Sequence, residues 1–161
     1  NGLRGEVLPR RENAQAPLYR PLRYRNSIRI DLSFRDDIIM ETTKRRIIHR
    51  YGEAISSEIP VLDFTEMMAE KLRALMERGY PKDYYDIWFH IDKIQDKRLL
   101  KELTKRKCNL VGIEFNPTNI FDIQTLKNVE SMWRTQLQHL LPHYVNFRHI
   151  LPDLKTKLSF L

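Results

Sequence analysis

Apolar and polar residues alternate early in the chain. From residue 28, isoleucine, leucine and phenylalanine alternate with arginine, aspartate and serine. This period of two predicts a strand over residues 27–35 with one apolar face, and Asp31 projects from the opposite face. A second strand is predicted within residues 38–49. A short third strand is predicted at residues 59–62, where Pro60 is typical of an edge strand.

After residue 62 the hydrophobic pattern becomes helical. Asp63 is a good N-cap, and Glu66 stands three residues later, which predicts a capping box. This helix is expected over residues 64–78, with Gly79 directly beyond its end. Pro81 then favours the first turn of another helix. Further helices are predicted at residues 97–107, 125–141 and 144–160.

The strands come first and the helices follow, which predicts an α+β fold. We expect a small N-terminal β-sheet portion followed by a mainly helical C-terminal region. Residues 1–16 lack periodicity and mix arginine, glutamate, asparagine and proline, which predicts a flexible, irregular arm. The predicted organisation continues with a β-rich portion over residues 17–62 and a helical subdomain over residues 63–161.

The composition excludes several classes of protein. The chain has 161 residues, of which 42% are hydrophobic and 30% charged, as in ordinary globular domains. Its single cysteine, Cys108, excludes an intrachain disulfide. No apolar run approaches the roughly 20 residues that a membrane span needs, so we expect a cytoplasmic protein without a membrane partner.

The basic charge is unevenly distributed. The formal net charge is +7, and arginines crowd the first thirty positions. A second basic cluster consists of Lys44, Arg45, Arg46 and Arg50. Arginine suits bidentate contact with phosphate, so the charge favours a nucleic-acid or nucleotide partner. Solubility alone remains the alternative explanation.

Three acidic or basic positions in the helical region are chemical candidates. Lys71 shares the apolar face of its helix, where an ammonium must reach water or meet an anion. Asp83 and Asp86 lie three residues apart and so share a face of the helix that Pro81 opens. As a pair they suit Mg²⁺, or they could orient Lys71 and Arg78. The helix dipole alone explains Asp83 in the first turn, whereas Asp86 among aromatics is explained less readily.

One contiguous stretch resembles a known family. Residues 62–75 read LDFTEMMAEKLRAL, residues 77–79 read ERG and residues 82–88 read KDYYDIW. This resembles the AbiEii/AbiGii toxin-type nucleotidyltransferases, in which an AEKL-A helix with a functional lysine leads to an R-D-x-x-D motif. The strand containing Asp31 resembles the one that holds the family's later active-site acid. The resemblance covers roughly residues 27–160.

The chain also departs from the family pattern. Lys82 stands where the family usually has arginine, which keeps the charge and loses the bidentate fork. The family's glycine-serine motif and its paired D-x-D acids have no counterpart in residues 1–26. We therefore expect either a C-terminal portion of a nucleotidyltransferase that is inactive by itself or a divergent member of the family that lacks catalysis.

The resemblance implies transfer of a nucleotide from an NTP to an acceptor hydroxyl, on tRNA or another RNA, with an antitoxin protein as a further partner. Asp31 would bind Mg²⁺ beside the attacking hydroxyl, and Lys71 would contact the triphosphate. Asp83 and Asp86 would position Lys71 and complete the charge network. The implied substrate-binding residues are Arg78 and Lys82. The alternative is a non-catalytic module that binds RNA or a protein partner.

Overall fold

The computed structural model describes residues 3–7, 28–32, 37–48 and 57–161, and the side chains from residue 37 onward within these ranges. It divides into two compact units, Asn1–Asp37 and Ile38–Leu161. Strands occupy the N-terminal part and helices the C-terminal part, which confirms the predicted α+β class.

The first unit contains a two-stranded antiparallel sheet. Strand β2, Ile28–Leu32, lies inside the predicted strand. It pairs with β1, Leu3–Val7, so that Arg4 stands opposite Asp31. The prediction of an irregular arm over residues 1–16 is therefore wrong for β1. Five residues are too short for their alternation to stand out, and the strand forms because its backbone groups bond to a partner distant in sequence.

The second unit begins with another two-stranded antiparallel sheet. Strand β3, Thr43–Arg46, pairs with β4, Glu58–Val61, and Lys44 stands opposite Pro60. Each strand is an edge of its two-stranded sheet, which confirms the position predicted for Pro60. Every residue of both strands is exposed. The sheet therefore contributes little to the apolar core.

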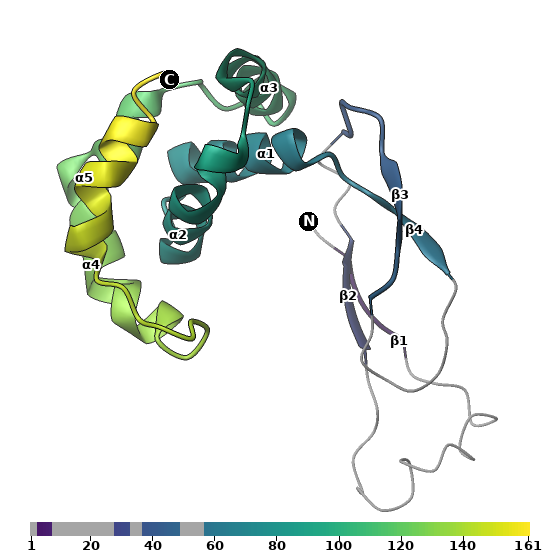
Figure 1. Cartoon of the computed structure of the whole chain (residues 1–161), viewed down its shortest axis with the longest axis horizontal. Coiled ribbons are helices and arrows are strands. Elements are labelled where there is room, and N and C mark those ends of the chain that lie inside the picture. Colours follow the sequence, from purple (N-terminus) through teal and green to yellow (C-terminus); the bar gives the residue numbers. More distant parts are fainter. Residues whose placement is uncertain (1–2, 8–27, 33–36, 49–56) are drawn as a thin grey trace, which may run out of the picture. The chain divides into compact units, whose positions relative to one another are not determined.

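The rest of the second unit is helical. The helices are α1 (Phe64–Glu77), α2 (Pro81–His90), α3 (Lys97–Leu110), α4 (Ile123–Leu137) and α5 (Phe147–Lys157), with short 3-10 helices η2 (Ile91–Lys93) and η3 (Pro117–Phe121). Figure 1 shows α1 and α2 between α3 on one side and the α4–α5 pair on the other. Helix α4 ends at Leu137, earlier than predicted, and residues 138–140 form a turn before Pro142.

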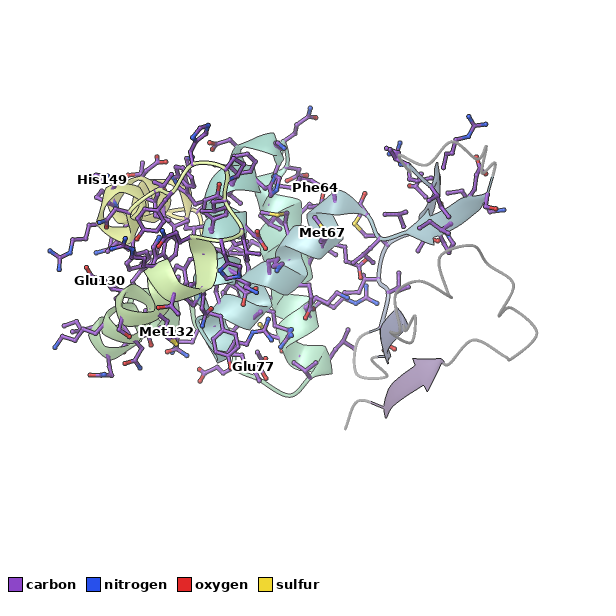
Figure 2. All side chains as sticks on the ribbon, turned by 90° about the horizontal axis from the view of Figure 1, so that it is seen from below. Phe64, Met67, Glu77, Glu130, Met132 and His149 are labelled. Carbon is purple, nitrogen blue, oxygen red and sulfur yellow. The ribbon has the colours of Figure 1, made fainter. Side chains whose placement is uncertain are left out.

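Aromatic side chains occupy the centre of this helical unit. Tyr84 and Trp133 are fully buried, and the ring of Phe147 contacts both of them. The polar tips are satisfied, because Tyr84 donates to the carbonyl of Ile120 and Trp133 Nε1 donates to that of Val145 at 2.8 Å. Side chains fill the space between the helices (Figure 2). Each large apolar side chain buried in this way stabilises the fold by about 1.5–3 kcal/mol.

The corner between α1 and α2 is built on a glycine. Gly79 follows Arg78, the C-cap of α1, and has a φ of 56°, as predicted for a glycine beyond a helix end. A Cβ at this position would lie 2.7 Å from Cγ2 of Thr125 in α4. Glycine is therefore required here both by the backbone conformation and by the close approach of α4.

The start of α1 only partly follows the sequence prediction. The Asp63 carboxylate caps the helix by accepting from the backbone N–H of Thr65 at 2.7 Å and of Glu66 at 3.3 Å. The capping box predicted for Glu66 is wrong, because its carboxylate binds groups outside α1. Tertiary contacts decide the direction of this side chain.

Glu66 is the most deeply buried acid in the described residues, with none of its surface exposed. Its carboxylate accepts from the backbone N–H of Ile39 at 2.8 Å and of Met40 at 2.7 Å. It also forms an ion pair of 2.7 Å with Nζ of Lys107 in α3. Burial by itself would raise the pKa of Glu66, but Lys107 and the two N–H donors hold the pKa below its ordinary value. This carboxylate therefore joins α1, α3 and the segment before β3.

We predict that Glu66→Gln lowers the free energy of unfolding by about 3 kcal/mol, because it removes the fully buried carboxylate that pairs with the Lys107 ammonium. Chemical denaturation at neutral pH measures this change. The matched control is Glu102→Gln, which removes an exposed carboxylate paired with Lys105 and should cost less than about 1 kcal/mol. Equal costs for the two variants would contradict the prediction.

The same variant should change the dependence of stability on acid. A carboxylate whose folded pKa is lowered contributes stability above its unfolded pKa, and this contribution is lost as the pH falls. Below about pH 4 the wild-type chain should therefore lose stability more steeply than Glu66→Gln. Denaturation curves between neutral pH and pH 3 measure the two slopes.

Candidate functional site

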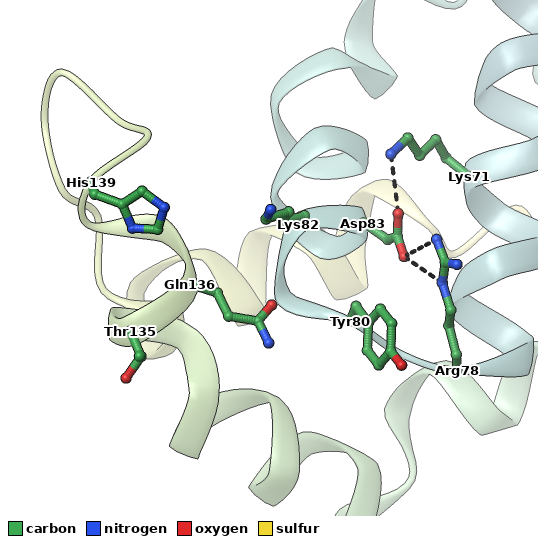
Figure 3. A pocket seen from close by; sticks show the side chains of 8 residues that line it. All are labelled: Lys71, Arg78, Tyr80, Lys82, Asp83, Thr135, Gln136 and His139. Carbon is green, nitrogen blue, oxygen red and sulfur yellow. Dashed lines mark hydrogen bonds and ion pairs between the residues drawn. The ribbon is translucent and has the colours of Figure 1, made fainter. Parts of the chain in front are cut away.

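Asp83 lies at the centre of a charged cluster where α1 meets α2. Its Oδ1 accepts from Nζ of Lys71 at 3.1 Å. Its Oδ2 accepts from Nε and Nη2 of Arg78, both at 3.2 Å. The side chain is only 2% exposed, and each of its two oxygens holds a cation (Figure 3). The buried carboxylate thus fixes two basic groups at the same place.

Asp86 adds a second carboxylate to this cluster. Its Oδ2 lies 2.9 Å from Nζ of Lys71, and its side chain is 40% exposed. The prediction that Lys71 is directed at the two acids is confirmed. This pairing explains how a lysine can stand on an apolar helix face, since its charge is met by two carboxylates.

The two acids differ in burial and in number of partners, and not in the way that the sequence indicated. The helix dipole was expected to explain Asp83, and Asp86 was the less readily explained carboxylate. In the structure Asp83 is the buried acid with two cationic partners, and Asp86 lies at the edge with one. The spacing of residues places both acids on one face of α2, but it does not show which of them is buried.

Electrostatics keep the Lys71 ammonium charged. Burial by itself would lower the pKa of Lys71, but the hydrogen bonds to Asp86 and Asp83 outweigh this effect and raise the pKa above its ordinary value. Lys71 therefore carries a positive charge throughout the physiological pH range. It can serve as a fixed cation for an anionic ligand.

A cavity of about 600 Å³ opens beside these residues. Its lining side chains come from the middle and the end of α1, the start of α2, the end of α4 and the turn that follows it. They are Lys71, Arg78, Tyr80, Lys82, Asp83, Thr135, Gln136 and His139 (Figure 3). Of the residues from Arg78 to Asp83 that line the cavity, sequence analysis missed only Tyr80. It missed all the α4 contributors, since no local pattern connects them with α1 and α2.

Other predicted site residues fall outside the described side chains. Asp31 lies on β2 in the first unit, and the structure describes only its backbone. Its place in the site therefore stays a prediction. The same holds for the basic cluster of the first thirty residues and for Arg50. Of the second basic cluster, Lys44, Arg45 and Arg46 lie on the exposed strand β3.

The described carboxylates do not fit a magnesium site. Mg²⁺ needs free oxygen ligands in octahedral geometry, but both oxygens of Asp83 and one oxygen of Asp86 already bind cationic side chains. Among residues 37–48 and 57–161, no group of three or more His, Cys, Asp or Glu side chains is placed to hold a metal. Instead, both acids bind Lys71, and Asp83 also binds Arg78. The Mg²⁺ prediction depends on Asp31.

We predict that Asp83→Asn lowers the free energy of unfolding by about 3 kcal/mol, because it leaves Lys71 and Arg78 facing each other without the buried charge between them. Urea denaturation measures the loss. The matched control, Asp86→Asn, removes a half-exposed partner of the same lysine and should cost less than about 1 kcal/mol. The central role of Asp83 would be contradicted if Asp86→Asn cost as much.

No helix in the described residues is long and apolar enough to cross a bilayer.

Comparison with known proteins identifies the family. The curated proteins and the solved structures give no match to the chain. The family model described as "Nucleotidyl transferase AbiEii toxin, Type IV TA system" matches residues 6–159, which is nearly the whole chain. The chain therefore belongs to the AbiEii nucleotidyl transferase toxin family.

Proposed function

We propose that this chain holds the triphosphate of an NTP for nucleotide transfer to an acceptor hydroxyl of tRNA or another RNA. The observation that carries the proposal is the cavity in which Lys71, Arg78 and Lys82 stand together beside the buried Asp83. Membership of the AbiEii family supports the reaction class. The acceptor RNA and the roles of individual residues are part of the proposal.

The cluster is organised before any ligand arrives. Asp83 and Asp86 use two of the three N–H donors of Lys71, which leaves one for a phosphate oxygen. Arg78 is held through Nε and Nη2, and about half of its side chain stays exposed, so Nη1 can reach a ligand. Lys82 is exposed at the rim of the same cavity. Fixed cations bind a polyanion without the cost of ordering themselves.

In the proposed reaction the acceptor oxygen attacks the α-phosphorus of the NTP. A new P–O bond forms, and the bond between the α-phosphorus and the oxygen that bridges to the β-phosphate breaks. The hydroxyl proton passes to water, and pyrophosphate leaves. Negative charge develops on the leaving pyrophosphate, where Lys71 and Arg78 would stabilise it. Magnesium enters this proposal only through Asp31, and the roles of the described residues do not depend on it.

The first test measures nucleotide binding directly. Lys71→Ala should weaken the binding of ATP and of inorganic triphosphate by about 10- to 100-fold, which corresponds to the loss of one charged hydrogen bond. Isothermal titration calorimetry at low salt measures both affinities. Lys127→Ala removes an exposed lysine of α4 that does not line the cavity and is the matched control. If Lys71→Ala bound triphosphate like the wild type, the proposed role of the site would be wrong.

The proposed RNA acceptor has a candidate contact surface on β3. All four residues of this strand are exposed, and Lys44, Arg45 and Arg46 follow one another along it. Adjacent cations on an exposed strand suit a phosphate backbone. This observation also favours the alternative function, a non-catalytic module that binds RNA or a protein partner. A further explanation of these basic residues involves no partner, because charges on an edge strand prevent unwanted pairing with other strands.

A salt titration separates these possibilities. Arg45→Glu combined with Arg46→Glu should weaken RNA binding and lower the slope of log affinity against log salt by about 2, because two phosphate contacts are lost. Fluorescence anisotropy with a labelled tRNA measures the slope. The matched control is Arg98→Glu with Arg106→Glu, which reverses two exposed arginines of α3. If RNA binding were unaffected by salt or by the changes in β3, only the protection of the edge strand would explain these basic residues.

The family description places the chain in a type IV toxin-antitoxin system. An antitoxin protein is therefore a partner that we also propose. The cytoplasm, which supplies NTPs and tRNA, is the compartment that suits the proposed reaction.

A further inference from the structure

The cavity beside Asp83 has two chemically different ends. Lys71, Arg78 and Lys82 make one end cationic. The other end receives polar side chains from the end of α4 and the turn that follows it, namely Thr135, Gln136 and His139 (Figure 3). We propose that Tyr80 and Gln136 form the nucleobase subsite of this cavity and that Gln136 determines which base is preferred. This inference rests on the proposed function, and it assigns the part of the cavity that the triphosphate does not explain.

The polarity of the cavity orients a nucleotide within it. A nucleotide has an anionic phosphate end and a neutral, flat base end. The phosphates are attracted to the cationic end, so the base is directed towards α4. A volume of about 600 Å³ falls within the range of about 300–1,000 Å³ that is typical of small-molecule sites.

Tyr80 provides an aromatic ring for stacking. It precedes Pro81 as the N-cap residue of α2, and its side chain is 49% exposed. The guanidinium carbon of Arg78 lies 5.0 Å from the centre of the ring, a cation–π contact. Because Asp83 holds Arg78, the same carboxylate that orders the cationic end also supports the ring. A base that stacked on the exposed part of Tyr80 would complete the sandwich.

Gln136 provides a hydrogen-bonding group of the right kind. Its side chain extends from α4 towards the side of the cavity where Tyr80 and Lys82 lie (Figure 3). The amide nitrogen donates to the sulfur of Met132 at 3.6 Å, and a thioether is a weak acceptor that a base can replace at little cost. A primary amide offers a donor and an acceptor side by side, as recognition of a base edge requires.

Binding measurements with five ligands test the assignment. The affinities of the full chain for ATP, GTP, CTP, UTP and inorganic triphosphate are measured by calorimetry for the wild type and for Gln136→Ala. We expect the wild type to prefer one base, and the spread among the four NTPs to fall to within about twofold in Gln136→Ala. Triphosphate, which has no base, should bind both proteins equally. Gln124→Ala, which removes an exposed glutamine from the same helix, should keep the wild-type preference.

A second variant tests the stacking platform. Tyr80→Ala should weaken all four NTPs by about 5- to 100-fold, since the stacking of a base on an aromatic ring is lost. Its affinity for inorganic triphosphate should stay within about twofold of the wild type. Melting curves of each variant confirm that the fold is intact.

The outcomes separate this inference from the proposed function. If triphosphate binds well but Gln136→Ala keeps the wild-type order of NTPs, the nucleobase assignment is wrong and the proposed function stands. The assignment is also wrong if the wild type binds all four NTPs equally. If the wild-type chain binds neither triphosphate nor NTPs, the proposed function fails, and the nucleobase subsite fails with it.

Discussion

The arrangement of the site depends on one buried carboxylate. Asp83 is almost completely removed from solvent, and Lys71 and Arg78 each bind one of its oxygens. Burying an unpaired carboxylate would be costly, so the two cations are held where Asp83 requires them. Since Lys71 belongs to α1 and Asp83 to α2, the same contacts fix how these helices meet. The binding cavity opens directly beside this junction.

A second buried ion pair holds the opposite end of α1. Glu66 in its first turn binds Lys107 of α3 and the backbone of Ile39 and Met40. Helix α1 is thus tied to α3 near its start and to α2 from its middle to its end. Such pairs often add less to net stability than apolar packing of the same volume would, but breaking one leaves a buried charge uncompensated, which disfavours other arrangements of the helices. A site built on a helix held in this way keeps its cations in fixed positions.

The residues of the candidate site come from two separate parts of the chain. Lys71, Arg78, Lys82 and Asp83 lie within one short stretch, so a contiguous motif was sufficient to select them. Thr135 and Gln136 reach the same cavity from α4, and their own segment carries no sign of this role. Such a convergence depends on how α2 packs against α4, which is decided by the buried aromatic core. Sequence analysis could therefore predict the charged residues that α1 and α2 contribute to the cavity, but not the residues that come from α4.

The sequence alone determined features that depend on neighbouring residues. Asp63 caps α1 and Gly79 ends it, because a cap bonds to backbone groups two or three residues away and a left-handed turn depends on the local steric cost of a Cβ. Tertiary structure decided the direction of Glu66, which the local pattern assigned to a capping box. A buried carboxylate takes the strongest donors within reach, and Lys107 and the backbone of residues 39 and 40 come within reach only when the helices pack.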